Sequence, residues 1–216
     1  MSDTDSFIEE VTEEVRREKL FKMVKRYGWI AVLLVVLLVG GATWNELRKA
    51  SEREAAQNFG DAIIAALSPE DRLERADALT ALEAPTPGAD AMLKLLTAAE
   101  LGADNPSEAA EKLLTLSDRA DIPQVYRQVA TLKAMMIPDA GLDPADRRQR
   151  LEDLAQASGL LRLLAQEQIA MLEIEQGDPE AALTRQLDLY ADPEASPGLR
   201  ERASGANVAR GGDLTY

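Results

Sequence analysis

The sequence of 216 residues contains no cysteine and no histidine. Without cysteine the chain forms no disulfide, so even in an oxidising compartment its stability must come from packing alone. Without either residue type there is no thiolate or imidazole metal site, no cysteine or histidine nucleophile, and no histidine general base. Carboxylate and lysine chemistry remain, but these absences favour a protein that is not an enzyme and holds no cofactor or metal.

Positive charge is also scarce. The whole chain has 24 basic and 38 acidic residues, a net charge of −14. Residues 46–216 hold 18 of the basic and 31 of the acidic residues, which is −13 for that part. Nucleic acids and anionic lipid surfaces both select basic proteins, so this charge argues against them as partners. It suits a soluble, self-repelling domain that meets basic partners.

One long apolar run stands out, residues 27–45, which read YGWIAVLLVVLLVGGATWN. As an α-helix the run is about 28 Å long, close to the roughly 30 Å hydrocarbon core of a bilayer. It therefore predicts a single transmembrane helix. Aromatic and basic residues at its two ends favour the membrane–water interface, and they are Arg26, Tyr27, Trp29 and Trp44. A cleaved signal peptide stays an alternative, because small residues late in the run resemble a cleavage site.

The flanks of this run predict its orientation. Six basic residues fall within about fifteen positions before it and three within the same distance after it, and basic residues concentrate on the cytoplasmic side. We therefore expect residues 1–26 in the cytoplasm and residues 46–216 in the periplasm, with the span in the inner membrane. Residues 1–26 also carry an apolar stripe at helical spacing, which predicts an amphipathic helix. That helix either docks a cytoplasmic partner or only extends the span.

After residue 46 the sequence favours helix throughout, because Ala and Leu dominate and alternating β-branched runs are absent. A capping residue directly precedes proline at four places: Ser68-Pro69, Asn105-Pro106, Asp143-Pro144 and Asp178-Pro179. Such a pair is a favourable helix start, since the first side chain accepts an orphan backbone N–H and proline is tolerated at the first helical position. These prolines are 37, 38 and 35 residues apart.

A second series of helix breakers alternates with the first: Pro87-Gly88, Ile122-Pro123, Ser158-Gly159 and Ser196-Pro197-Gly198. The two series predict helices over residues 46–67, 69–84, 88–103, 106–119, 123–137, 144–157, 159–176, 179–191 and 197–210. Their shared period lies close to the tetratricopeptide period of about 34 residues. The predicted fold is all-α, a tetratricopeptide-like α-solenoid of about four helix pairs over residues 46–210, followed by a flexible tail at 211–216. An irregular helical bundle stays the alternative.

A binding surface is a better functional candidate than a catalytic site. Carboxylate pairs such as Asp178 and Glu180 are explained by their positions at helix starts, and no serine has a histidine to activate it. The first helix of each pair in such a solenoid lines a concave groove. Equivalent positions before two capping prolines predict four groove residues: Lys94, Ala98, Glu167 and Met171. Ordinary packing or solvated surface is the alternative for all four.

Several soft motifs resemble a known family. They are EEVRREK at residues 13–19, Tyr27-Gly28 opening the span, and REAA at residues 53–56 with Phe59. With the repeats, they resemble the YfgM-like membrane-anchored tetratricopeptide-like proteins of alphaproteobacterial type, ancillary subunits of the SecYEG translocon. The resemblance implies a cytoplasmic N-terminus, one inner-membrane span and a periplasmic repeat domain. It also implies association with the translocon and with periplasmic chaperones such as the PpiD foldase.

These observations favour a non-enzymatic scaffold at the inner membrane that binds proteins through its periplasmic repeats, with no nucleic acid and no small-molecule substrate. A membrane-tethered envelope regulator that acts through the cytoplasmic helix is the alternative. An envelope hydrolase is a third hypothesis, which turnover abolished by a carboxylate substitution would support.

Overall fold

The computed structural model describes the backbone of residues 3–208 and the side chains of residues 25–26, 29–30 and 33–205. Within that part the chain is all-helical, with nine helices and no strand. It divides into two compact units, Met1–Asn58 and Phe59–Tyr216. The expected apolar stripe of residues 1–24 and the expected tail at 211–216 lie outside the described side chains.

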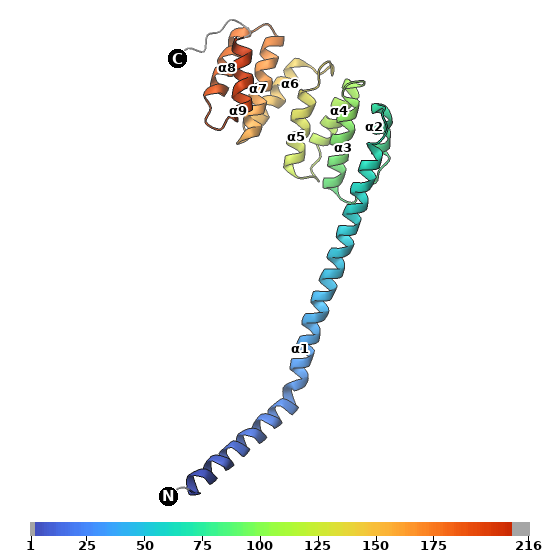
Figure 1. Ribbon diagram of the computed structural model, residues 1–216. Helices are drawn as coiled ribbons and strands as arrows, with labels where there is room; N and C mark the ends of the chain where they lie inside the picture. The colour runs from blue at the N-terminus through green and yellow to red at the C-terminus, as the bar shows by residue number, and fades with distance from the viewer. Residues whose placement is uncertain (1–2, 209–216) are drawn as a thin grey trace. The chain divides into compact units, whose positions relative to one another are not determined.

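The helices follow one another with short connections (Figure 1). Their bounds are α1 Asp3–Ala66, α2 Arg72–Thr80, α3 Pro87–Leu101, α4 Pro106–Ser117, α5 Gln124–Met135, α6 Pro144–Ala155, α7 Leu160–Glu175, α8 Pro179–Ala191 and α9 Pro197–Val208. From α2 onward each helix coincides with a predicted one, and most ends agree within two or three residues. The prediction of an all-α, solenoid-like succession is confirmed.

Residues 3–66 form one uninterrupted helix. The backbone of the N-terminal helix therefore continues into residues 27–45, as in the alternative that it only extends the span. Gly40 and Gly41 lie inside it, since glycine weakens a helix without ending it. Residues 46–58 are all exposed, and among the described side chains of α1 Phe59 is the first that packs against a core. The compact repeat unit therefore begins at Phe59, not at Glu46.

The predicted membrane span at residues 27–45 lies within α1. Among the residues that the structure describes, no helix is long and apolar enough to cross a membrane. Residues 27, 28, 31 and 32 of that run lie outside the described side chains.

Local capping explains where the helices of the repeat unit begin. Pro106, Pro144 and Pro179 are the first residues of α4, α6 and α8, as predicted. The Ser68-Pro69 prediction is wrong, because α2 begins at Arg72 and its N-cap is Asp71, whose Oδ1 accepts from the Glu74 N–H at 3.0 Å. The Ser68 hydroxyl donates to the Ile64 carbonyl of α1 at 3.0 Å, so Ser68 belongs to the end of that helix.

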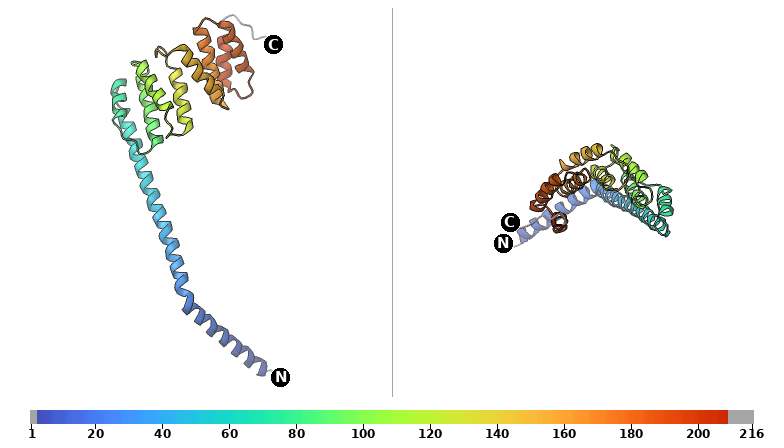
Figure 2. Two further views of the ribbon diagram at one scale, coloured as in Figure 1. Left: turned by 180° about the vertical axis from the view of Figure 1, so that it is seen from behind. Right: turned by 90° about the horizontal axis from the view of Figure 1, so that it is seen from above.

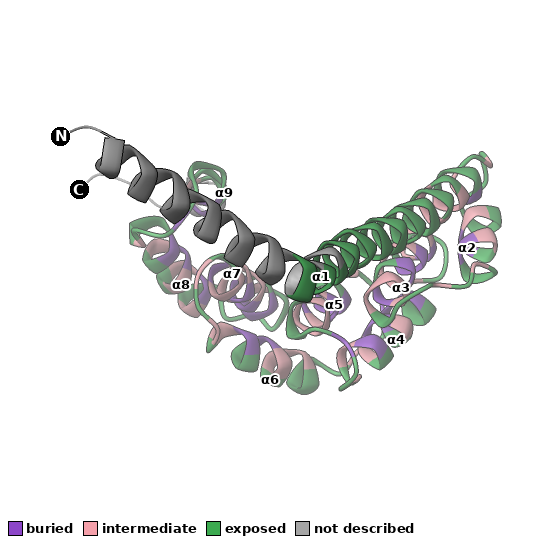
Figure 3. Cartoon of the chain, turned by 90° about the horizontal axis from the view of Figure 1, so that it is seen from below, coloured by how far each residue is buried: buried purple, intermediate pink, exposed green. Residues whose placement is uncertain are grey.

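Helices α2–α9 follow a curved path, seen from above in Figure 2. Figure 3 shows α3, α5 and α7 on the inner side of the curve and α2, α4, α6 and α8 on the outer side. We call these two sets the inner row and the outer row. Each inner helix packs against outer neighbours, and α3–α5 and α5–α7 also contact each other along the inner row. Helix α9 packs on α8 and covers the C-terminal end of this arrangement.

The core lies between the two rows, where buried residues of each helix face the other row (Figure 3). Many of these positions are alanines with no exposed surface: Ala91, Ala109, Ala110, Ala130, Ala134, Ala165, Ala170 and Ala182. Small side chains let helix axes approach closely, while the leucines between them fill the remaining volume. Ala109 and Ala110 of α4 and Ala182 of α8, which follow the prolines that begin these helices, belong to this set.

Candidate protein-interaction surface

The inner row exposes large apolar side chains that the core does not use. Their exposed fractions run from 39% to 59%, and they are Met92 on α3, Val125 on α5, Met136 at its C-terminal end, and Leu160 and Met171 on α7. On α5 and on α7 the two exposed residues are eleven positions apart, which places them on one side of the helix. We call these five side chains, with the two depressions described next, the inner apolar face.

Two shallow depressions lie between helices of the inner row. The first, of about 260 Å³, lies between α3 and α5, with Met136, Ile137 and Lys133 in its wall and the buried Leu113 of α4 at its base. The second, of about 470 Å³, lies between α5 and α7. It is lined by Gln124, Val125, Gln128, Val129, Ala157, Ser158 and Leu161. Glutamine amides both donate and accept hydrogen bonds, so this second depression offers apolar surface together with groups that pair with a polypeptide backbone.

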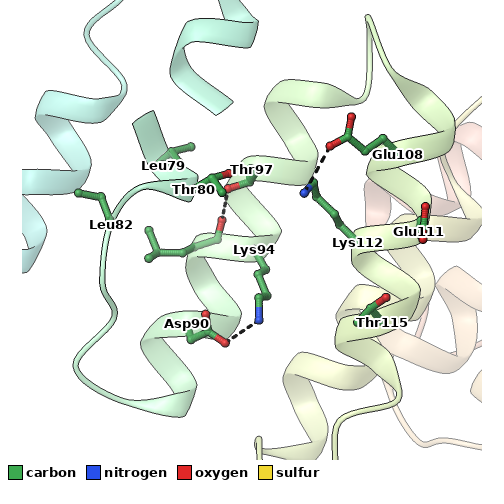
Figure 4. Close-up of a pocket in the computed structure, with 11 residues that line it drawn as sticks. Leu79, Thr80, Leu82, Asp90, Lys94, Thr97, Glu108, Glu111, Lys112 and Thr115 are labelled. Atoms are coloured by element: carbon green, nitrogen blue, oxygen red, sulfur yellow. Dashed lines mark hydrogen bonds and ion pairs between the residues drawn. The ribbon is translucent and has the colours of Figure 1, made fainter. Parts of the chain in front are cut away.

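A third depression of about 370 Å³ lies among α2, α3 and α4 (Figure 4). Its base is apolar, and both of its lysines are paired with carboxylates on their own helices. The Lys94 ammonium lies 2.9 Å from Asp90 Oδ2, and the Lys112 ammonium lies 3.4 Å from Glu108 Oε1. The Thr97 hydroxyl donates to the Leu93 carbonyl at 2.9 Å. Glu111 lines the same depression and forms no ion pair among the described residues.

The four predicted groove residues lie in different parts of the repeat unit. Lys94 lines the depression among α2, α3 and α4. Ala98 is 2% exposed and lies at the base of the α3–α5 depression. Glu167 Oε1 and Oε2 accept from Arg202 Nε and Nη2 of α9 at 2.7 and 2.9 Å. Met171 is exposed on the inner row, so the structure places Met171 and Ala98, but not Lys94, on the inner apolar face.

Four of the five exposed apolar residues were missed by sequence reasoning: Met92, Val125, Met136 and Leu160. The sequence could have indicated them, because each is an apolar residue on a helix that has enough other apolar residues to form its buried contacts. Reading that signal requires knowing which side of each helix is buried, and the spacing of prolines does not give it.

The predicted membrane-interface residues belong to the other unit. Arg26, Trp29 and Trp44 are exposed on α1, with Trp29 and Trp44 at 64% and 75%. The side chain of Tyr27 lies outside the described residues. Trp29 and Trp44 are fifteen residues apart, which is about 22 Å along a helix.

Arginines join neighbouring helices of the repeat unit. The Glu173 side chain of α7 is only 4% exposed, and Arg185 Nη2 of α8 and Arg148 Nη1 of α6 lie 2.7 and 3.5 Å from its Oε1. A buried carboxylate is tolerated only when it is paired and hydrogen-bonded, so this arrangement holds three helices together.

A second carboxylate, Asp90 on α3, is held in a similar way. Partial burial acts to raise the pKa of Asp90, but hydrogen bonds from Lys94 and Arg119 outweigh this and lower it below the ordinary value of 3.8. Arg119 also donates to Asp121, and the hydrogen bonds that it donates, first to Asp121 and then to Asp90, raise the pKa of its guanidinium. Asp90 is therefore ionised in the folded chain at neutral pH.

Among the described residues, no cluster of acidic side chains is arranged to hold a metal ion. What the geometry defines is an all-helical, solenoid-like protein with an exposed apolar surface on its inner row. Comparison with known proteins adds no name to this description, because no family, no curated protein and no solved structure matches the chain.

Proposed function

We propose that this protein is a non-enzymatic scaffold that binds segments of other proteins at its inner apolar face and is held at a membrane by residues 27–45. The observation that carries the proposal is the exposure of Met92, Val125, Met136, Leu160 and Met171 on three successive inner helices. Exposed apolar patches on soluble domains commonly mark interaction sites. Methionine also adapts its shape to varied partner sequences.

The repeat period supports a tetratricopeptide-like class for the solenoid. Four helix pairs can be formed, from the end of α1 with α2 through to α7 with α8, and α9 follows as a terminal helix. Repeats of this kind use the curved inner surface for extended or helical segments of partners.

Two observations support the membrane anchor. The run from Leu33 to Val39 is apolar at every position, and each of these seven side chains is exposed by 50% or more in the described chain. A helix that is apolar on all sides is stable when its surface is buried, and the lipid chains of a bilayer can bury it. The excess of basic residues before the run favours a cytoplasmic N-terminus and a periplasmic repeat unit. A phosphatase fusion after Tyr216 tests this orientation, since activity is expected only if the C-terminus is periplasmic.

The partners remain those that the resemblance implies, the SecYEG translocon and a periplasmic foldase such as PpiD. At such a site the scaffold would raise the local concentration of chaperones around emerging chains, so weak contacts suffice. Purification of the full chain from gently solubilised membranes, followed by mass spectrometry, tests these partners directly.

The binding surface is tested by placing a photo-crosslinking residue in the full chain in cells. Met136 on the inner apolar face and Leu73 on α2 of the outer row are both exposed apolar residues, at 52% and 40%, and they form a matched pair. We expect protein adducts from position 136 and none from position 73. Equal adducts from both positions, or none from either, would overturn the proposal that the inner apolar face is the binding surface.

A further inference from the structure

The unpaired charge on the inner row is positive. The inner helices carry five acidic residues, and each has a basic partner: Asp90 with Lys94 and Arg119, Glu100 with Arg75 at 2.6 Å, Glu167 with Arg202 at 2.7 Å, Glu173 with Arg185 at 2.7 Å, and Glu175 with Arg147 at 2.6 Å. Of their basic residues, Lys94 and Arg162 are paired as well. Arg127 and Lys133 form no ion pair among the described residues, and both belong to α5, which contains no acidic residue. The central helix of the inner row therefore holds two uncompensated cations, in a chain whose net charge is −14.

Of these two cations, Lys133 is the one that lines the depression between α3 and α5. Six positions separate it from Arg127, so the two side chains leave the helix on different sides. Lys133 is exposed, and the exposed Met136, three positions later and on neighbouring surface, belongs to the same wall. An ammonium group without a partner therefore lies beside a large apolar side chain at this depression.

The α3 side of this depression is built from small residues. Ala98, Ala99 and Gly102 line it, and their short side chains leave the space beside α5 open. The described residues that line the depression include no acidic one. Its volume of about 260 Å³ is below the roughly 300–1,000 Å³ of small-molecule sites. The depression therefore suits a single side chain of a protein partner better than a whole metabolite.

From these observations we infer that the α3–α5 depression binds an aliphatic side chain of a partner protein, and that Lys133 pairs with an aspartate or glutamate beside that side chain. The inference rests on the proposed function and adds the chemistry of the occupant. An acidic residue at this place gains an ion-pair partner, whereas a basic residue would be repelled by Lys133 and would lose hydration against Met136. The net charge of the whole sequence favours basic partners at long range, but the charge at contact distance determines which segment fits.

Selection from a displayed peptide library tests the inference. Each peptide has aliphatic residues at its centre and random residues at its flanks, and the full chain is immobilised in non-ionic detergent at about 0.15 M salt. The screening length is then roughly 8 Å, so charges in contact act more strongly than distant ones. We expect aspartate and glutamate to be enriched in the flanks of the selected peptides. Because the chain as a whole attracts basic peptides, non-specific charge attraction would produce the opposite enrichment.

A charge exchange tests whether Lys133 causes the enrichment. The best selected peptide is synthesised with glutamate, glutamine or lysine at the enriched position, and fluorescence anisotropy measures its binding to the full chain against protein-free micelles. We expect Lys133→Gln to weaken the glutamate peptide by about fivefold, the upper end for an exposed ion pair, and to leave the glutamine peptide unchanged. Lys133→Glu should reverse the order, so that the lysine peptide binds best.

Lys49→Gln is the matched control for this exchange. Lys49 of α1 is also exposed and forms no ion pair among the described residues. Its substitution removes the same charge from the chain as Lys133→Gln does, but in the other compact unit. The glutamate peptide should therefore keep its full affinity for this variant.

Other outcomes would overturn the inference. If the selected flanks are neutral or basic and Met136→Gln weakens those peptides, the acidic preference is wrong and the proposed scaffold function stands. The same holds if no peptide is selected while crosslinks from position 136 persist in cells. An acidic preference that survives both substitutions of Lys133 would show that the carboxylate binds elsewhere on the chain. The absence of both selected peptides and crosslinks would overturn the inference and the proposed function together.

Discussion

The inner and outer rows of this solenoid are built from similar helices but present opposite surfaces to solvent. Both rows bury alanine and leucine toward the shared core. On the exposed side the inner row shows methionine, valine and leucine, with all its carboxylates paired, whereas the outer row shows carboxylates without partners. The same helical repeat therefore separates a surface suited to binding from a surface suited to solubility.

The largest expected effect separates a buried and an exposed leucine of a single inner helix. Leu163 of α7 is fully buried against Leu189 and Leu199, while Leu160, one turn earlier, is exposed. Leu163→Ala should lower the free energy of unfolding by about 2–5 kcal/mol, because it removes apolar contacts and leaves a cavity. Leu160→Ala should change it by less than about 1 kcal/mol. Urea denaturation followed by circular dichroism measures both, and equal losses would show that α7 packs differently.

The second effect concerns the arginines that neutralise the inner row. Glu173→Ala leaves Arg148 and Arg185 without their shared carboxylate, and breaking a buried ion pair costs about 3 kcal/mol. Asp188→Ala on α8 is the control, since this exposed carboxylate has no ion-pair partner among the described residues. The same denaturation measurement applies. A loss no greater than that of the control would mean that the Glu173 pairs add nothing to stability.

A smaller effect distinguishes two helix starts of the outer row. Asp143 Oδ1 accepts from the N–H groups of Ala145 and Asp146 at 2.8 and 3.2 Å, whereas Asn105 makes no side-chain capping bond. Asp143→Ala should therefore lower the free energy of unfolding by about 1 kcal/mol, the usual effect of a lost N-cap. Asn105→Ala should cost clearly less, although both residues directly precede a proline. Thermal unfolding of the two variants provides the comparison, and an equal loss would contradict it.

The smallest effect depends on pH. The pKa of Asp90 is lower in the folded chain than its ordinary value of 3.8, so the folded state binds fewer protons in that range. The stabilisation from this ion pair is therefore present above about pH 4 and is lost as the pH falls through the folded pKa. Arg119→Gln should cost less than about 1 kcal/mol at neutral pH, since the group is partly solvated.

That cost should disappear on acidification. Unfolding of the native chain and of the Arg119→Gln variant, measured over a pH series, checks this. A difference that stays constant down to low pH would show that Arg119 acts through packing and not through its charge.

The helix succession was predictable because helix starts are local chemistry. Thr86, Asp143 and Asp178 cap helices whose first residue is the next proline, and the sequence contains everything needed for those contacts. The Ser68-Pro69 start failed for an equally local reason, since Asp71 offers a carboxylate cap three residues later. The boundary at residue 46 follows from charge and hydropathy, and α1 runs through it to Ala66.

The candidate surface was predictable only in part. Met171 was identified from its spacing and is exposed, but Lys94 lies in another depression and Glu167 is paired with Arg202, 35 residues along the chain. Spacing relative to a proline fixes a position along a helix. It does not determine which side of that helix its neighbours cover.

The sequence by itself thus determined the helical class, the period, most helix starts, and the excess of negative charge, because each depends on residue type and near neighbours. Only the tertiary structure decided which residues form the inner apolar face and which carboxylates are neutralised. Those properties depend on contacts such as Arg75 with Glu100 and Arg147 with Glu175, which join side chains 25 and 28 residues apart. Packing brings such groups together, and no local pattern records them.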